Sequence, residues 1–311
     1  MRVTILTGGT GGAKFIRGMM DVVSPTDLTI IGNTGDDCQV WGLHISPDLD
    51  TVMYQLAGLL DEERGWGVRN DTFTCLAMMG FYGEPMWFKL GDRDLATHLK
   101  RTRLLQSGWS LADVTAMLCQ SLGISARLLP MSNDRVETRL HTPHGVLSFQ
   151  EYFVRERWRP EVTGIEFVGS DRAQPAPGVV DALRHADGVI IAPSNPITSI
   201  GPMLSISGIR QALQETPAPV VAISPLIGGH AVSGPAARLL ASQGYEPSPR
   251  GIARFYSGLI DWLLIDEKDA ALADEIARQG IRVALAPLLM RDREASRALA
   301  QAALACCQQT V

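Results

Sequence analysis

Residues 7–14 read TGGTGGAK and follow a short apolar strand predicted over residues 2–6. A helix is predicted close behind them, over residues 15–22. Glycines between a strand and a helix let backbone N–H groups approach an anion, and the helix N-terminus adds a partial positive charge. We therefore expect Gly9, Thr10, Gly11, Gly12 and Lys14 to bind a phosphorylated ligand. The alternative is a tight packing turn without a ligand.

The details of this segment exclude two common nucleotide-binding motifs. A dinucleotide fingerprint needs glycine where Lys14 stands, and a P-loop needs Ser or Thr where this chain has Phe15. A nicotinamide enzyme is further disfavoured because Asn33, rather than an acidic residue, follows the second predicted strand. The segment therefore predicts a phosphate group without identifying its carrier.

Short apolar runs alternate with helical patterns through the last third of the chain. Strands are predicted over residues 189–192, 220–223, 262–265 and 283–288, with helices over 204–213, 236–241, 270–277 and 294–306. The strands predicted over residues 3–6 and 28–31 repeat this pattern at the N-terminus. Buried strands separated by helices are typical of a parallel, doubly wound sheet. The expected fold is α/β, Rossmann-like, doubly wound and mainly parallel.

The middle of the chain interrupts this alternation. Helices are predicted over residues 94–105 and 110–122, the second with Ser110 as N-cap, and residues 127–168 alternate in places like a small β-rich element with a turn at 144–145. The Rossmann-like core is therefore expected to be discontinuous, over residues 1–60 and 176–311. Residues 61–175 form an inserted helical and β-rich region that helps to build the ligand pocket.

Four aspartates follow the second predicted strand: Asp36, Asp37, Asp48 and Asp50. The carboxyl ends of strands are where open α/β sheets bind ligands. Carboxylate oxygens with few sulfur or imidazole competitors suit Mg²⁺, which takes one or two carboxylates together with substrate phosphate. We expect a Mg²⁺ site here, whereas capping of the next helix is the alternative for Asp48 or Asp50.

Three further loops carry polar residues. Prolines fix the shape of residues 193–202, whose hydroxyl and amide groups suit a nucleotide or phosphate, and residues 224–229 repeat the pattern of glycine after a strand. In residues 91–98, Asp94 is expected to cap the next helix, and His98 is either a ligand-binding residue or a surface histidine. The expected ligand-binding residues of these loops and of the second strand end are Asn33, Thr34, His98, Ser194, Asn195, Pro196, Ser199, Ser224 and Gly228.

Composition limits the class of partner. The chain has 28 basic and 33 acidic side chains, and this balance argues against nucleic-acid binding. Five scattered cysteines without CxxC spacing predict neither a disulfide framework nor a zinc site, so a cytoplasmic location is expected. No basic-then-apolar leader and no apolar run of about 18 residues is present, so neither export nor membrane insertion is expected.

Taken together, these motifs resemble one family, the 2-phospho-L-lactate transferases of coenzyme F420 biosynthesis, known as CofD in archaea and FbiA in actinobacteria. The resemblance runs nearly end to end. It is carried by TGGTGGAK, NTGDD at 33–37, PDLDT at 47–51, RGWGVRNDT at 64–72, GDRDLATH at 91–98, APSNPITSIGP at 192–202 and PLLM at 287–290. The departures are Lys14, where FbiA-like chains tend to have Arg, and residues 227–229, where the run varies.

The resemblance implies transfer of a phosphorylated three-carbon acid from a guanosine diphosphate conjugate to the ribityl hydroxyl of the deazaflavin Fo, with Mg²⁺ and release of GMP. The acid is phosphoenolpyruvyl, 2-phospholactyl or 3-phosphoglyceryl, and the bacterial members, which this chain resembles most, imply an enolpyruvyl donor. A homodimer is expected.

The residues divide among these tasks. Residues 9–12 and 194–199 are expected to cradle the diphosphate and guanosine, and Lys14 or Arg93 to neutralise the diphosphate. Asp50 is expected to bind Mg²⁺ with Asp36 or Asp37. The predicted catalytic residues are Asp48, Asp50, Arg93 and Asp94, although a surface ion pair is the alternative for Arg93.

A non-catalytic, sugar-nucleotide-binding regulator of the YvcK type is the alternative function, since it shares a related Gly-rich start. The PDLDT and GDRDLATH motifs favour the enzyme, because a pure binder needs no metal-poised site for a nucleophile.

Overall fold

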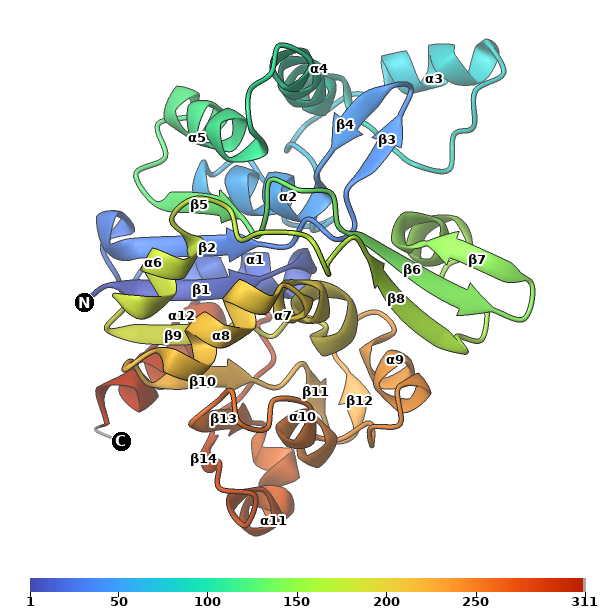
Figure 1. Cartoon of the computed structure of the whole chain (residues 1–311). Coiled ribbons are helices and arrows are strands. Elements are labelled where there is room, and N and C mark those ends of the chain that lie inside the picture. Colours follow the sequence, from blue (N-terminus) through green and yellow to red (C-terminus); the bar gives the residue numbers. More distant parts are fainter. Residues whose placement is uncertain (310–311) are drawn as a thin grey trace.

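A seven-stranded, fully parallel sheet forms the centre of the computed structural model, which describes residues 1–309 (Figure 1). The strand order is β14-β13-β10-β9-β1-β2-β5. The bounds are β1 Val3–Thr7, β2 Leu28–Gly32, β5 Arg127–Pro130, β9 Gly188–Ile191, β10 Val220–Ile223, β13 Trp262–Ile265 and β14 Arg282–Leu285. The predicted α/β, doubly wound and Rossmann-like fold is confirmed.

Helices cover both faces of the sheet, which is why the central strands are apolar throughout. All residues of β1, β9, β10 and β13 are buried. Successive side chains point to opposite faces: Ile5 belongs to one core cluster and Leu6 to the other. One cluster contains residues of α1 Gly9–Met19, α2 Pro47–Leu56, α5 Leu111–Ser121 and α12 Arg293–Gln308.

The other core cluster is built by shorter helices, several of which cross in front of the sheet in Figure 1. They are α6 Val179–Arg184, α7 Gly201–Ser205, α8 Ser207–Glu215, α9 Ala236–Ser242, α10 Pro249–Phe255 and α11 Ala273–Ala277. Short single-turn elements lie between them and elsewhere: η1 Pro25–Asp27, η3 Pro196–Ile200 and η4 Glu267–Leu272.

Several predicted bounds were wrong. The helix predicted over residues 204–213 is two helices, because Ile206 has an extended backbone (φ −81°, ψ 112°). The helix predicted over 270–277 is a 3₁₀ turn followed by α11. β14 ends at Leu285 rather than 288, two residues before Pro287, which lacks an N–H for the ladder.

The insert supplies a helical part and a small antiparallel sheet. Its elements are α3 Thr74–Phe81, α4 Asp92–Gln106, α5, and the sheet β7-β6-β8 made of β6 Glu137–Thr142, β7 Gly145–Ser148 and β8 Gly164–Val168. Ser110 caps α5 as predicted, accepting from the Asp113 N–H at 3.1 Å. The turn predicted at 144–145 joins β6 to β7.

One strand from within the predicted insert belongs to the core. β5, which the sequence placed in the β-rich element, pairs with β2 and forms an edge of the seven-stranded sheet. Apolar periodicity does not distinguish an edge strand of one sheet from a strand of another.

Two short hairpins complete the fold, β3 Cys38–Val40 with β4 Leu43–Ile45, and β11 Leu226–Ile227 with β12 His230–Ala231. Within residues 1–309, no helix is both long enough and apolar enough to cross a membrane.

Candidate active site

The loops that follow β1, β2 and β9 meet at the carboxyl end of the sheet, because these three strands are neighbours. Ser194 Oγ accepts from the Gly8 N–H at 3.1 Å and donates to the Gly8 carbonyl at 2.8 Å, so it joins two of the loops. A Cβ at Gly8 would lie 2.4 Å from Asp48 Oδ2 and 2.8 Å from Ser199 Cβ. Glycine at position 8 therefore allows these loops to pack closely.

The Gly-rich segment is the first turn of α1, which begins at Gly9 rather than at the predicted residue 15. A Cβ at Gly11 would lie 2.6 Å from the Pro193 carbonyl oxygen, and one at Gly12 would lie 1.7 Å from Thr7 Oγ1. Packing alone therefore explains glycine at these two positions. Gly9 (φ +71°) has no atom within 4 Å of its Cβ position.

The N-terminus of α1 already faces an anion of the chain itself. Asp48 Oδ1 accepts from the Gly9 N–H at 2.6 Å, where the helix dipole favours negative charge. Thr10 is half-buried and Lys14 is exposed. Phosphate binding by Gly9, Thr10 and Lys14 stays a prediction.

Asp36 and Asp48 form a buried pair of carboxylates. Within residues 1–309, both accept hydrogen bonds only from neutral N–H groups. The Asn33 Nδ2 group donates to Asp36 Oδ1 and to Asp48 Oδ2, each at 3.0 Å. Burial, followed by the charges of Asp48 and Asp37, raises the pKa of Asp36 well above its ordinary value. Burial also raises the pKa of Asp48 to about 6, although Asn33 and the Gly9 N–H oppose the rise. In the described part of the chain, neither carboxylate accepts a hydrogen bond from a cationic side chain, and binding of Mg²⁺ stays a prediction.

Asp37 has one paired and one unpaired oxygen. Its Oδ2 accepts from Ser46 Oγ at 2.7 Å and lies 3.0 Å from His44 Nε2, and β4 supplies that histidine. Burial raises the pKa of Asp37, against the lowering by His44. Its Oδ1 is buried with no hydrogen-bond partner among residues 1–309, as are the hydroxyls of Thr34 and Thr198.

Asp50 faces away from this pair. Two residues along a helix correspond to a rotation of about 200°, and the Asp50 carboxylate is turned to α4, where both Arg101 Nη atoms donate to it, Nη1 at 3.0 Å. Arg101 is 1% exposed. The predicted Mg²⁺ ligand Asp50 is therefore one half of a buried ion pair.

The face of α4 that carries Arg101 also carries His98 and Asp94, which extend this buried group of polar side chains. His98 is 1% exposed, with Nε2 at 3.2 Å from Asp94 Oδ1 and Nδ1 at 3.7 Å from Asp50 Oδ2. Tyr54 donates to Asp94 Oδ1 at 2.7 Å. Burial alone would raise the pKa of Asp94, but its close contact with His98 and the hydrogen bond from Tyr54 hold it below its ordinary value. The interpretation of His98 as a surface residue was wrong.

Other predicted residues make local contacts. Asn195 accepts from the N–H groups of Ile197 and Thr198 and so caps η3, whose first residue is the buried Pro196. Arg93 is exposed and donates to the Arg69 carbonyl at 3.4 Å. Their roles in ligand binding stay predictions.

Two predicted residues lie after β10. The Ser224 hydroxyl bonds to the backbone of Leu226, and the Gly228 N–H donates to Asp269 Oδ2 at 2.9 Å. These contacts shape the β11–β12 hairpin. Binding of ligand by Ser224 or Gly228 stays a prediction.

Sequence reasoning missed four residues that contact the aspartates: His44, Ser46, Arg101 and Gln150. Arg101 had a signal, because Asp94, His98 and Arg101 are spaced i, i+4, i+7 and share one face of a helix. Gln150, whose Nε2 donates to Asp36 Oδ2 at 3.2 Å, had none, since it lies 114 residues away in the chain. Among residues 1–309, no three His, Cys, Asp or Glu side chains gather into a metal cage.

Comparisons with known proteins show the family to which the chain belongs. The family model described as 2-phospho-L-lactate transferase CofD matches residues 3–298. A phosphoenolpyruvate transferase of Streptomyces griseus subsp. griseus is 46% identical, covering 98% of each chain, and one of Kitasatospora aureofaciens is 47% identical, covering 99% of this chain and 98% of the other. A 2-phospho-L-lactate transferase of Methanosarcina mazei is 40% identical, covering 96% of this chain and 97% of the other.

Among solved structures, a protein from Bacillus halodurans superposes with a TM-score of 0.65 at 18% identity, covering 97% of this chain and 99% of that one. Another structure from the same organism, described as a member of the UPF0052 family, has a TM-score of 0.63 at 16% identity. These two likenesses show the fold alone. From the family match and the transferase relatives together, the chain belongs to the 2-phospho-L-lactate transferase CofD family and is an enzyme that transfers a phospho-acid group, as expected for coenzyme F420 biosynthesis.

Proposed function

We propose that this enzyme transfers a phosphoenolpyruvyl group from a guanosine diphosphate conjugate to the ribityl hydroxyl of Fo, releasing GMP with the help of Mg²⁺. The observation that carries the proposal is the buried pair of Asp36, in the loop after β2, and Asp48, in the first turn of α2, beside the N-terminus of α1. Relatives named phosphoenolpyruvate transferases are 42–47% identical, and two named 2-phospho-L-lactate transferases are 40% and 42% identical; the higher identities of the former support the enolpyruvyl donor.

The residues present fit a magnesium ion. Mg²⁺ needs one or two carboxylates and takes its other ligands from water and substrate phosphate, so it requires no cage of three protein ligands. Asp36 and Asp48 repel each other, and neither accepts a hydrogen bond from a cationic side chain within the described range. A bound Mg²⁺ would neutralise the diphosphate and the leaving GMP. Asp50 is the weaker candidate because Arg101 already compensates its charge.

The reaction exchanges one phosphorus–oxygen bond for another. The ribityl oxygen forms a bond to the phosphorus of the phospho-acid, the anhydride bond to GMP breaks, and the hydroxyl proton passes to a carboxylate. We assign the orientation of this hydroxyl to Asp37, because its Oδ1 is buried and unpaired while Ser46 and His44 fix its other oxygen. Phosphoryl transfer has a loose transition state, so positioning and charge neutralisation suffice.

We assign the binding of the deazaflavin ring of the acceptor Fo to the insert. Arg64 lies over the rings of Phe73 and Trp66, at 5.0 and 6.0 Å from their centroids. This group is close to α1, since a Cβ at Gly65 would lie 3.1 Å from Thr10 Cγ2. Flat aromatic and guanidinium surfaces suit stacking on a deazaflavin. The proposal includes a homodimer in the cytoplasm and no nucleic-acid or membrane partner.

A competition experiment tests the donor. The purified enzyme is offered Fo, Mg²⁺ and equal amounts of the phosphoenolpyruvyl, 2-phospholactyl and 3-phosphoglyceryl conjugates of guanosine diphosphate. Mass spectrometry of the products should show mainly Fo bearing the enolpyruvyl group. A product bearing mainly one of the other acids would overturn the donor assignment while leaving the transferase reaction in place.

A further inference from the structure

Gln150 reaches from the insert to the buried aspartate pair. It follows the β6–β7 hairpin and directly precedes the π-helical turn η2, Glu151–Arg155. Its side chain is 5% exposed, and its Nε2 group lies 3.2 Å from Asp36 Oδ2 and 3.3 Å from the Asp36 carbonyl oxygen. The Asp36 carboxylate is therefore held on both oxygens by amides, since Asn33 donates to the other one.

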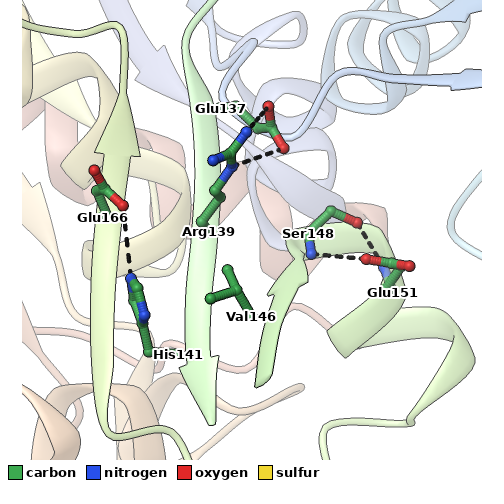
Figure 2. Close-up of a pocket in the computed structure, with 7 residues that line it drawn as sticks. All are labelled: Glu137, Arg139, His141, Val146, Ser148, Glu151 and Glu166. Atoms are coloured by element: carbon green, nitrogen blue, oxygen red, sulfur yellow. Dashed lines mark hydrogen bonds and ion pairs between the residues drawn. The ribbon is translucent and has the colours of Figure 1, made fainter. Parts of the chain in front are cut away.

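The turn that carries Gln150 is fixed on both sides. The Ser148 N–H donates to Glu151 Oε2 at 2.9 Å, and the Glu151 N–H donates back to Ser148 Oγ at 3.3 Å, as Figure 2 shows. Glu151 lines an open cavity of about 320 Å³ on the insert sheet, whereas Gln150 is buried. A second hydrogen bond joins the sheet β7-β6-β8 to the loop that carries Asp36, because the Thr138 N–H donates to the Gly35 carbonyl at 2.7 Å.

We propose that Gln150 is a positioning residue that sets the orientation of Asp36 for a divalent cation. This inference rests on the proposed function, in which Asp36 is a Mg²⁺ ligand. A neutral amide fixes a carboxylate while leaving its charge available, whereas the guanidinium of Arg101 consumes the charge of Asp50. Residues that hydrogen-bond to ligating carboxylates tune metal affinity, and their loss typically weakens it by about 10- to 100-fold.

The test replaces Gln150 by methionine, which has a similar length and no donor. Mn²⁺ serves as the probe, and its binding to the full-length protein with GDP is titrated by electron paramagnetic resonance. We expect Gln150→Met to raise the Mn²⁺ dissociation constant by about tenfold or more. Turnover should recover towards the wild-type value at saturating Mg²⁺, which damage to the fold alone would not allow.

Glu151→Gln is the matched control, since its amide oxygen still accepts from the Ser148 N–H, so that the turn and the contact of Gln150 with Asp36 are kept. It should keep the wild-type Mn²⁺ affinity. If Gln150→Met does not fold, Gln150→Asn serves instead, because its amide is one methylene too short for the contact.

The outcomes separate the two proposals. Unchanged Mn²⁺ affinity in a folded Gln150 variant overturns the positioning role, even if the wild type transfers the group. A wild type that binds Mn²⁺ but transfers no phospho-acid rejects the proposed reaction, and weakened binding in the variant would still support the role of Gln150. A wild type without Mn²⁺ affinity overturns the inference.

Discussion

At the scale of single residues, the buried aspartates differ in what compensates their charge. Asp36 and Asp48 accept only from amides, whereas Asp50 is paired with the Arg101 guanidinium. Desolvation penalises an uncompensated carboxylate strongly, and for this reason we assign the proposed cation to Asp36 and Asp48. Asp50, whose charge Arg101 already compensates, is the weaker candidate for that role.

This division explains the limits of the sequence prediction. The aspartates and their place after a strand were identifiable because strand ends bind ligands in this fold class. Their partners were not, since Arg101 lies 51 residues from Asp50 and Gln150 lies 114 residues from Asp36. Contacts over such separations depend on how the insert packs on the core.

Asp50→Asn should destabilise the fold as well as reduce activity. The change leaves the buried Arg101 without its counter-ion, which typically costs about 3–5 kcal/mol. Urea denaturation should show this loss, and the double variant Asp50→Asn/Arg101→Met should regain most of it, because no charge is then left unpaired. A single variant as stable as the wild type would show that the ion pair contributes nothing to folding.

At the scale of elements, close packing against neighbouring segments determines the residues at the start of α1. The sequence predicted a glycine loop before a helix, but the glycines form the first helical turn, and two of them leave no room for a Cβ beside neighbouring segments. Their partners, Pro193 and Thr7, belong to β9's loop and to β1. The sequence motif identifies the glycines, but the atoms that lie beside each glycine are known only from the folded structure.

Gly11→Ala should destabilise the protein by about 1–3 kcal/mol, because the new methyl group would lie 2.6 Å from the Pro193 carbonyl oxygen. Gly9→Asn is the contrasting variant, since position 9 has open space and asparagine tolerates its φ of +71°. Its stability should stay within about 1 kcal/mol of the wild type. Equal denaturation midpoints for wild type and Gly11→Ala would contradict the packing argument.

The larger elements were predictable because their apolar periodicity is strong, as in β10 and β13, whose bounds match the prediction. The break at Ile206 and the placement of β5 were not, since both depend on tertiary packing rather than on local pattern.

At the scale of the whole molecule, the burial of the uncompensated carboxylates Asp36 and Asp48 reduces the stability of the folded protein. Burial raises the pKa of Asp48 to about 6 and that of Asp36 well above its ordinary value of 3.8. Between pH 3.8, the ordinary pKa of an aspartate, and pH 6, near the raised pKa of Asp48, the folded protein binds more protons than the unfolded chain. Without a cation, the free energy of unfolding must therefore fall as the pH rises through this window.

Urea denaturation in EDTA should show this fall between pH 4.5 and 6, and the shift of Asp48 corresponds to about 1–2 kcal/mol over this window. Added Mg²⁺ should reduce the fall, because it binds the ionised carboxylates of the folded state. The groups whose pKa is lowered, such as Asp94, contribute mainly below this window. A stability that rises with pH in EDTA would contradict the assignment of Asp36 and Asp48 as uncompensated carboxylates.

The most direct measurement is the Mg²⁺-dependent appearance of the two products from Fo and the phosphoenolpyruvyl conjugate. Mass spectrometry should find GMP and phosphoenolpyruvyl-Fo in equal amounts with the wild type, and neither in EDTA. Asp48→Asn should lower turnover by about 100-fold or more while remaining folded, because it removes one of the two carboxylates assigned to the cation. Equal turnover in EDTA, or an Asp48→Asn variant as active as the wild type, would contradict the account.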